Sequence, residues 1–225
     1  MIAALAVLAL VLGYGLVELA TQEPNEELVR LQGLDESQQA FGGVPQQGDR
    51  IGSANAPVTI QIFNDVQCAD CRRDFLTTVP GLMESLARPG EAKLLYRHHS
   101  VARTPLQLGF LGAEAAAEQG YGWQYVYLFF RNQDEAERVG VDEDFLAAVA
   151  GATGELEVER WRRDFAEAAD PDSRIARRLD GYEELAQGLG IRSRQAAVVS
   201  GPRGTVTLQD GPTLREIERA AQRVR

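Results

Sequence analysis

Cysteine and histidine are both scarce in this sequence, which contains two of each among 225 residues. With no other cysteine in the chain, Cys68 and Cys71 can pair only with each other or with another molecule. The histidines, His98 and His99, are neighbours at the end of a predicted strand, where adjacent side chains point to opposite faces, so both could hardly join the cysteines on one metal ion. We expect no metal site and no cofactor. Metal binding by the two cysteines and one histidine stays an alternative.

Basic side chains are also few: the sequence has 23 of them and 33 acidic ones, so the formal net charge is −10. A chain that binds nucleic acid usually carries a broad basic surface, so we expect no nucleic-acid partner. The hydrophobic share of 44% and the charged share of 25% are ordinary for a globular protein. They exclude a fully disordered chain, a collagen and a multi-span membrane protein.

The sequence has one long apolar run, residues 2–17, and no Lys or Arg precedes it. A membrane-spanning helix takes about 17–25 apolar residues, so this run is at the short edge. We expect residues 1–20 to form an uncleaved signal-anchor that enters the cell membrane through residues 2–17. The protein would then be single-pass, with the rest of the chain outside the cytoplasm. The alternatives are a cleaved signal peptide, which would leave a secreted or periplasmic protein, and a buried core helix.

The remainder divides into a predicted linker and a predicted α/β domain. Residues 21–50 are rich in Gln, Glu and Gly and poor in large apolar side chains, which is typical of a flexible, solvated linker. In residues 51–225, the patterns predict strands at 57–63, 93–98, 196–199 and 205–208, helices at 68–86 (kinked at Pro80) and 212–225, and a helical block over about 104–190. This order predicts an α/β domain with a helical insertion.

Cys68-Ala69-Asp70-Cys71 follows the first predicted strand and opens the first predicted helix. On a helix, positions three apart share a face, so the two cysteines can close a disulfide. At the helix N-terminus the macrodipole favours an anion, which lowers the pKa of Cys68 and predicts that it is the nucleophile. Cys71 lies one turn further along and suits a resolving role. A purely structural disulfide stays open, although so short a loop would stabilise the fold weakly.

Two neighbours are expected to tune the reactive thiol in opposite directions. Asp70 places a carboxylate between the cysteines, which raises the pKa of the thiol, whereas Arg72 lowers it if it points toward the sulfurs. The sequence does not fix the sum of these effects, so the direction of exchange stays open.

The segment APVTIQIFNDVQCADCRRDF resembles the opening of the DsbA-like branch of the thioredoxin superfamily. YRHHSVARTP resembles that family's second strand and the turn that follows, and GYGWQYVYLFF resembles the aromatic helix of its insertion. The resemblance implies a thioredoxin-like fold with a helical insertion over residues 51–225. It also implies thiol–disulfide exchange on exported proteins, a membrane redox partner, attack by Cys68 and resolution by Cys71.

Two positions depart from the family pattern. Its members usually carry a cis-proline in a loop that faces the disulfide and pairs with the substrate backbone, whereas the matching stretch here has Arg194-Gln195. A cis bond before a residue other than proline costs about 2.5–4 kcal/mol, so we expect a trans or strained loop. The family also often has an acid six residues before the first cysteine, where this chain has Ile62. The alternative function is therefore a partly degenerate binding or scaffold module without turnover.

Overall fold

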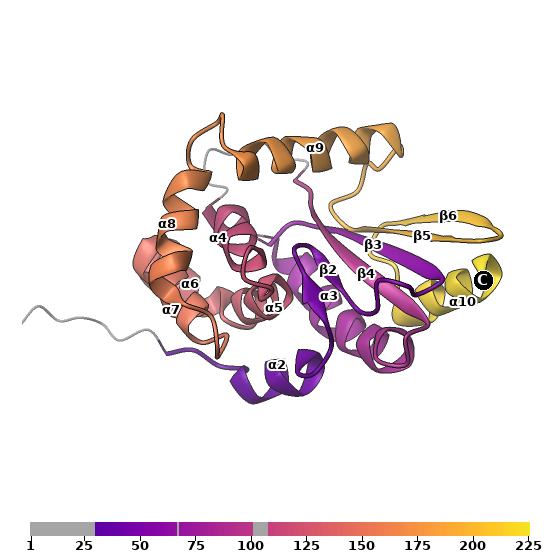
Figure 1. Ribbon diagram of the computed structural model, residues 1–225, viewed down its shortest axis with the longest axis horizontal. Coiled ribbons are helices and arrows are strands. Elements are labelled where there is room, and N and C mark those ends of the chain that lie inside the picture. The colour runs from indigo at the N-terminus through magenta and orange to yellow at the C-terminus, as the bar shows by residue number, and fades with distance from the viewer. Residues whose placement is uncertain (1–29, 67, 101–107) are drawn as a thin grey trace, which may run out of the picture.

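The computed structural model describes residues 30–66, 68–100 and 108–225, and its centre is a twisted sheet (Figure 1). Within these ranges the sheet has six strands in the order β1-β2-β4-β3-β5-β6, and only the β3–β4 pair is parallel. The strands are β1 (Gln46–Gln47), β2 (Arg50–Ile51), β3 (Val58–Asn64), β4 (Ala92–His98), β5 (Ala196–Gly201) and β6 (Gly204–Gln209). The four long strands match the predicted ones, and a tight turn joins β5 to β6.

Helices cover both faces of the sheet and form a separate layer at one end (Figure 1). They are α2 (Leu34–Phe41), α3 (Ala69–Leu82), the π-helical turn η1 (Met83–Ala87), α4 (Leu108–Ala117), α5 (Gly122–Arg131), α6 (Gln133–Val139), α7 (Glu143–Gly151), α8 (Val158–Ala168), α9 (Arg174–Gly188) and α10 (Leu214–Val224). Pro80, the site of the predicted kink, lies inside α3, and the helix changes to the π-helical turn η1 three residues later, at Met83.

The side chains of β3 point alternately to the two faces of the sheet, and the hydrophobic core therefore has two parts. Val58, Ile60 and Ile62 point to the face covered by α3 and α10 and join the main hydrophobic cluster. Phe63 points to the other face, where it packs with Val198 and with Ala186 of α9. Since α3 connects the parallel strands β3 and β4, the carboxyl end of β3 leads directly into the cysteine pair at the start of α3.

The helical insertion lies between β4 and β5 and comprises α4 to α9, which agrees with the predicted block over about 104–190. Its centre is α4, which is buried on nearly every side. The small residues of α4 permit this packing: a Cβ on Gly112 would lie 2.3 Å from the Tyr125 hydroxyl oxygen, and one on Gly109 would lie 2.9 Å from Val66 Cγ2. The alanine- and glycine-rich composition of α4 therefore reflects close helix packing.

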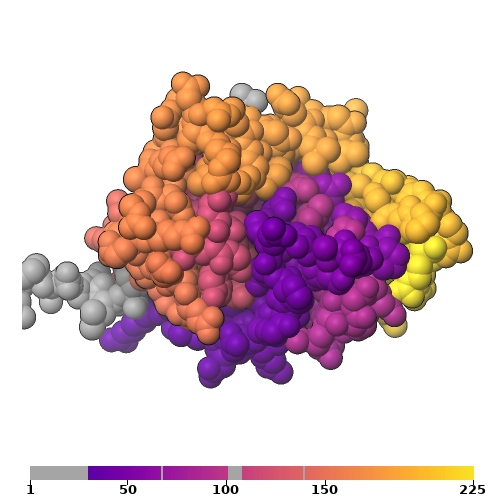
Figure 2. Space-filling view, viewed as in Figure 1, coloured from indigo at the N-terminus to yellow at the C-terminus, as the bar shows by residue number. Residues whose placement is uncertain are grey.

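The prediction of a solvated linker over 21–50 is wrong for its second half. In the structure, residues 34–41 form α2, and the short strands β1 and β2 extend the sheet. Phe41 is 1% exposed and packs against the rings of Trp123 and Tyr127, at centroid distances of 6.4 and 5.5 Å. Figure 2 shows this indigo segment lying on the surface between the insertion and the magenta residues of the sheet domain. Residues 21–29 lie outside the described residues.

In the part of the chain that the structure describes, no helix is both long enough and apolar enough to cross a membrane. The predicted anchor, residues 2–17, lies outside the described residues.

Candidate active site

Cys68 and Cys71 form a disulfide at the N-terminus of α3. Cys68 is the N-cap residue, and its extended backbone conformation ends the loop that follows β3. Its Sγ accepts a hydrogen bond from the backbone N–H of Cys71, at 3.2 Å. This donor and the positive end of the helix dipole both stabilise negative charge on that sulfur.

The two cysteines differ in exposure. Cys68 retains 7% of its surface, whereas Cys71 is fully buried. An incoming thiolate can therefore reach the sulfur of Cys68 more readily than that of Cys71.

Residues far along the chain hold the loop in front of Cys68 in place. The carbonyl oxygen of Asp65 accepts the Cys68 N–H at 3.1 Å, and the Asp65 carboxylate accepts the Ser100 hydroxyl at 2.9 Å. From α6, the Gln133 side-chain amide donates to the carbonyl oxygen of Val66 at 2.6 Å. These contacts attach the loop both to the end of β4 and to the insertion, which fixes the position of the first cysteine.

Asp70 and Arg72, the two predicted tuning residues, have different surroundings. The Asp70 side chain is 87% exposed, and its nearest charged partner is Arg73 at 3.9 Å. The Arg72 guanidinium makes a two-pronged ion pair with Asp134 of α6, with N–O distances of 2.5 and 2.9 Å. The hydrogen bond and charge of Arg72 lower the pKa of Asp134 below its ordinary value. Sequence reasoning missed Asp134, which is 62 residues away and carries no local signal.

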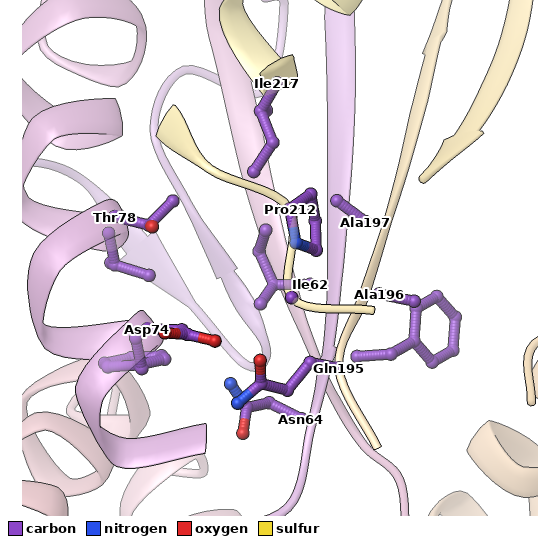
Figure 3. A pocket seen from close by; sticks show the side chains of 13 residues that line it. Ile62, Asn64, Asp74, Thr78, Gln195, Ala196, Ala197, Pro212 and Ile217 are labelled. Carbon is purple, nitrogen blue, oxygen red and sulfur yellow. The ribbon is translucent and has the colours of Figure 1, made fainter. Parts of the chain in front are cut away.

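The predicted substrate loop does lie against the disulfide. The carbonyl oxygen of Arg194 is 4.0 Å from Cys71 Sγ, and Gln195 follows immediately before β5. No described peptide bond is cis, so the bond before Gln195 is trans, one of the two states expected for it. The Gln195 side chain is only 8% exposed, and it points inward beneath the loop (Figure 3).

A small pocket of about 30 Å³ lies between α3, β3 and β5. Most of its lining is apolar and includes Ile62, but four polar side chains also line it: Asn64, Asp74, Thr78 and Gln195 (Figure 3). The sequence analysis did not single out Asn64 or Asp74. The position of Asp74, three residues after Cys71 on one helix face, was the available signal.

A larger and mostly apolar hollow of about 330 Å³ adjoins the cysteine motif at Ala69. Leu108, Phe129 and Ala136 from the insertion contribute to its lining. The disulfide therefore lies at the border between the sheet domain and an apolar surface of the insertion.

The two histidines point to different partners, as the strand alternation predicts. His98 Nε2 lies 3.4 Å from Glu114 of α4, and His99 Nδ1 lies 2.9 Å from Glu183 of α9. Among the described residues, no group of three or more His, Cys, Asp or Glu side chains is arranged to hold a metal ion.

Comparison with known proteins agrees with this architecture. The chain is 24% identical over 154 residues to a "probable disulfide bond formation protein D" of Bacillus cereus, which covers 67% of this chain and 70% of that protein. Its fold is similar to the crystal structure of oxidised BdbD from Bacillus subtilis, with a TM-score of 0.65, 17% identity and coverage of 80% of this chain and 95% of the other.

A second similar structure is MdbA, a thiol–disulfide oxidoreductase from Corynebacterium diphtheriae, with a TM-score of 0.59 and 16% identity over 81% of this chain and 93% of the other. The thioredoxin family model matches residues 46–183, which is more than half of the chain and includes both cysteines. With a DsbA-like fold around a disulfide-bonded Cys-x-x-Cys motif, the chain belongs to the thioredoxin family.

Proposed function

We propose that this protein is a thiol–disulfide oxidoreductase that acts through the Cys68–Cys71 disulfide. The observation that carries the proposal is the position of that disulfide at the N-terminus of α3, with Cys68 the less buried sulfur and the one that accepts the Cys71 N–H. A disulfide with a purely structural role needs neither a more accessible sulfur nor a hydrogen bond that stabilises a thiolate on it. The name of the Bacillus cereus relative also supports the proposal.

The geometry supports a two-step transfer. A substrate thiolate attacks Cys68 Sγ, so that a substrate–Cys68 disulfide forms, the Cys68–Cys71 bond breaks and Cys71 leaves as a thiolate. A second substrate thiolate then attacks the substrate sulfur of this mixed disulfide. The substrate disulfide forms and Cys68 leaves as a thiolate. Two electrons pass from the substrate to the protein, which becomes a dithiol and needs an oxidant, here proposed to be a membrane redox partner.

We assign the favoured direction to disulfide formation. The helix N-terminus and the Cys71 N–H stabilise a thiolate on Cys68, which favours the reduced form of the pair and makes its disulfide a stronger oxidant. Disulfides persist in oxidising compartments, so the substrates are exported proteins with free thiols, and the domain is extracytoplasmic. Residues 2–17 serve as its membrane anchor, or as a signal peptide if they are cleaved.

Two cysteine variants test the mechanism. Cys71→Ser leaves the attacking thiol without a resolving partner, so its Cys68 thiolate accumulates mixed disulfides with oxidised glutathione or with a disulfide-bonded test protein, each of which releases a thiol in the exchange. Cys68→Ser loses the more accessible of the two thiols and forms no mixed disulfide at a comparable rate. Non-reducing electrophoresis and mass spectrometry detect both outcomes. If Cys68→Ser retains full exchange activity, the assigned mechanism is wrong. If the wild-type protein exchanges with no thiol, the binding-module alternative replaces the proposal.

A further inference from the structure

Helix α6 of the insertion binds the chain on both sides of the cysteine pair. Its first residue, Gln133, forms a hydrogen bond with Val66, two residues before Cys68. Its second residue, Asp134, forms the ion pair with Arg72, the residue after the second cysteine. The exchange mechanism described above gives α6 no role, although this helix holds the chain before and after the motif.

The bond between Gln133 and Val66 is buried. Gln133 Nε2 donates to the Val66 carbonyl oxygen at 2.6 Å, and the two residues are 7% and 1% exposed. Within the described ranges of the chain, Gln133 is the one donor to this oxygen. A buried carbonyl oxygen without a donor is costly, so loss of the amide would drive Val66 to move toward another donor or toward water.

A displacement of Val66 would be passed on to the first cysteine. The Val66 side chain is packed closely on α4, where a Cβ on Gly109 would lie 2.9 Å from Val66 Cγ2. The next described residue, Cys68, donates its N–H to the carbonyl oxygen of Asp65 at 3.1 Å. The position of Cys68 Sγ relative to the Cys71 N–H, now 3.2 Å away, therefore depends on where this loop is held.

The residue before Gln133 fixes the start of α6. Asn132 is 3% exposed, and its Nδ2 donates to the carbonyl oxygens of Leu128 at 2.7 Å and of Gln32 at 3.0 Å. Its Oδ1 accepts the Gln32 N–H at 2.7 Å. A residue that positions a reactive group must itself be held in place, and these three bonds supply that support for Gln133.

We propose that Gln133 is a positioning residue that sets the reactivity of Cys68, because it holds Val66 where the Cys71 N–H can bind the Cys68 sulfur. This inference rests on the proposed exchange function, in which Cys68 is the reactive thiol. Gln133 acts through the backbone of the loop and takes no part in forming or breaking bonds. Without its amide, the Cys68 thiolate is stabilised less, so the pKa of that thiol rises and the disulfide becomes a weaker oxidant.

The first test is the pH dependence of Cys68 alkylation by iodoacetamide in the reduced full chain, with the labelled cysteine identified by mass spectrometry. Gln133→Met retains a side chain of similar size and removes the donor. At pH values where most of the thiol is protonated, we expect alkylation about fivefold slower than in the wild-type chain, the factor that one hydrogen bond typically contributes. At high pH, where the thiol is ionised in both chains, the rates converge.

The second test is the equilibrium of the same chains with glutathione. Because the thiolate is stabilised less, the equilibrium constant for reduction of the Gln133→Met disulfide should fall by a similar factor of about five. The matched control is Gln124→Met in α5. Gln124 is also buried, at 8% exposure, but its Oε1 accepts a hydrogen bond from Gln46 Nε2 in β1. This control loses a buried hydrogen bond, and we expect it to leave both measurements unchanged.

A purely structural role for Gln133 gives a different pattern. Both methionine variants would then lose stability in urea, and both would keep the wild-type alkylation profile. That result, or a shift of the profile in Gln124→Met as large as in Gln133→Met, would overturn the proposal.

A second substitution keeps the test decisive if Gln133→Met does not fold. Gln133→Glu preserves the length of the side chain but places an acceptor against the Val66 carbonyl, so its alkylation profile should move in the same direction. A folded Gln133→Glu chain with the wild-type profile would also overturn the proposal. Formation of a mixed disulfide between the wild-type chain and oxidised glutathione tests the exchange function separately, because alkylation requires no exchange.

Discussion

At the residue scale, the two charges beside the disulfide are both weakened by their surroundings. Asp70 is 87% exposed, so water screens its carboxylate, and the charge of Arg72 is offset by the ion pair with Asp134. Asp70 and Arg72 were expected to act on the reactive thiol in opposite directions, and each therefore has only a small effect on it. The hydrogen bond from the Cys71 N–H to Cys68 Sγ is buried and has no such screening.

We predict that Asp70→Asn makes the pair more oxidising, because it removes a like charge beside the Cys68 thiolate, but only slightly. An exposed charge interaction contributes about 1 kcal/mol or less, which for a two-electron couple corresponds to at most about 20 mV. Equilibration of the variant and the wild-type chain against glutathione measures this shift. A change of several times this size, or one toward a more reducing potential, would contradict the assignment.

At the element scale, α2 shows why part of the fold was not predicted from the sequence: it lies where a solvated linker was expected. Strands such as β3 and helices such as α10 follow from alternation and helical spacing within a few residues. The docking of α2 depends instead on Phe41, whose ring partners are more than 80 residues away in α5. The Arg72–Asp134 pair and the pocket around Asp74 join distant segments in the same way. The cysteine site was predictable because its residues are contiguous.

Phe41→Ala should destabilise the domain by about 3–5 kcal/mol, because it leaves a cavity against Trp123 and Tyr127. Leu34→Ala, on the same helix but at a side chain that is 44% exposed, should change stability by about 0.5 kcal/mol or less. Urea denaturation followed by fluorescence measures both variants. Equal, small effects would indicate that α2 is not docked as the structure shows.

At the scale of the whole molecule, a network of polar and charged side chains around the buried Glu114 fastens the insertion to the sheet domain. Glu114 of α4 is 2% exposed and lies between His98, at the end of β4, and Arg178 of α9. Arg178 also pairs with Glu118 at 2.7 Å, and Arg174 makes two bonds to the same carboxylate. Strand β4 and helices α4 and α9 are thus joined through these side-chain contacts.

This network predicts an acid-sensitive stability. Burial by itself would raise the pKa of Glu114, but the hydrogen bonds and charges of His98 and Arg178 lower it below its ordinary value. A lowered pKa in the folded state contributes stability above the ordinary value of about 4.3, and this contribution is lost as the pH falls further. Glu114→Gln should therefore cost about 3 kcal/mol at neutral pH and flatten the decline in acid. Urea titrations across this range, with Glu84→Gln as the exposed control, measure both effects.

The most direct test of the account is the equilibrium of the Cys68–Cys71 pair in the full chain with mixtures of reduced and oxidised glutathione. Alkylation and mass spectrometry report how much of the pair is dithiol at each ratio. We predict one two-electron transition with a potential between about −120 and −180 mV, the range of disulfide donors. A potential near −270 mV, as in thioredoxin, would contradict the assigned direction. A disulfide that does not equilibrate at any ratio would contradict the exchange function itself.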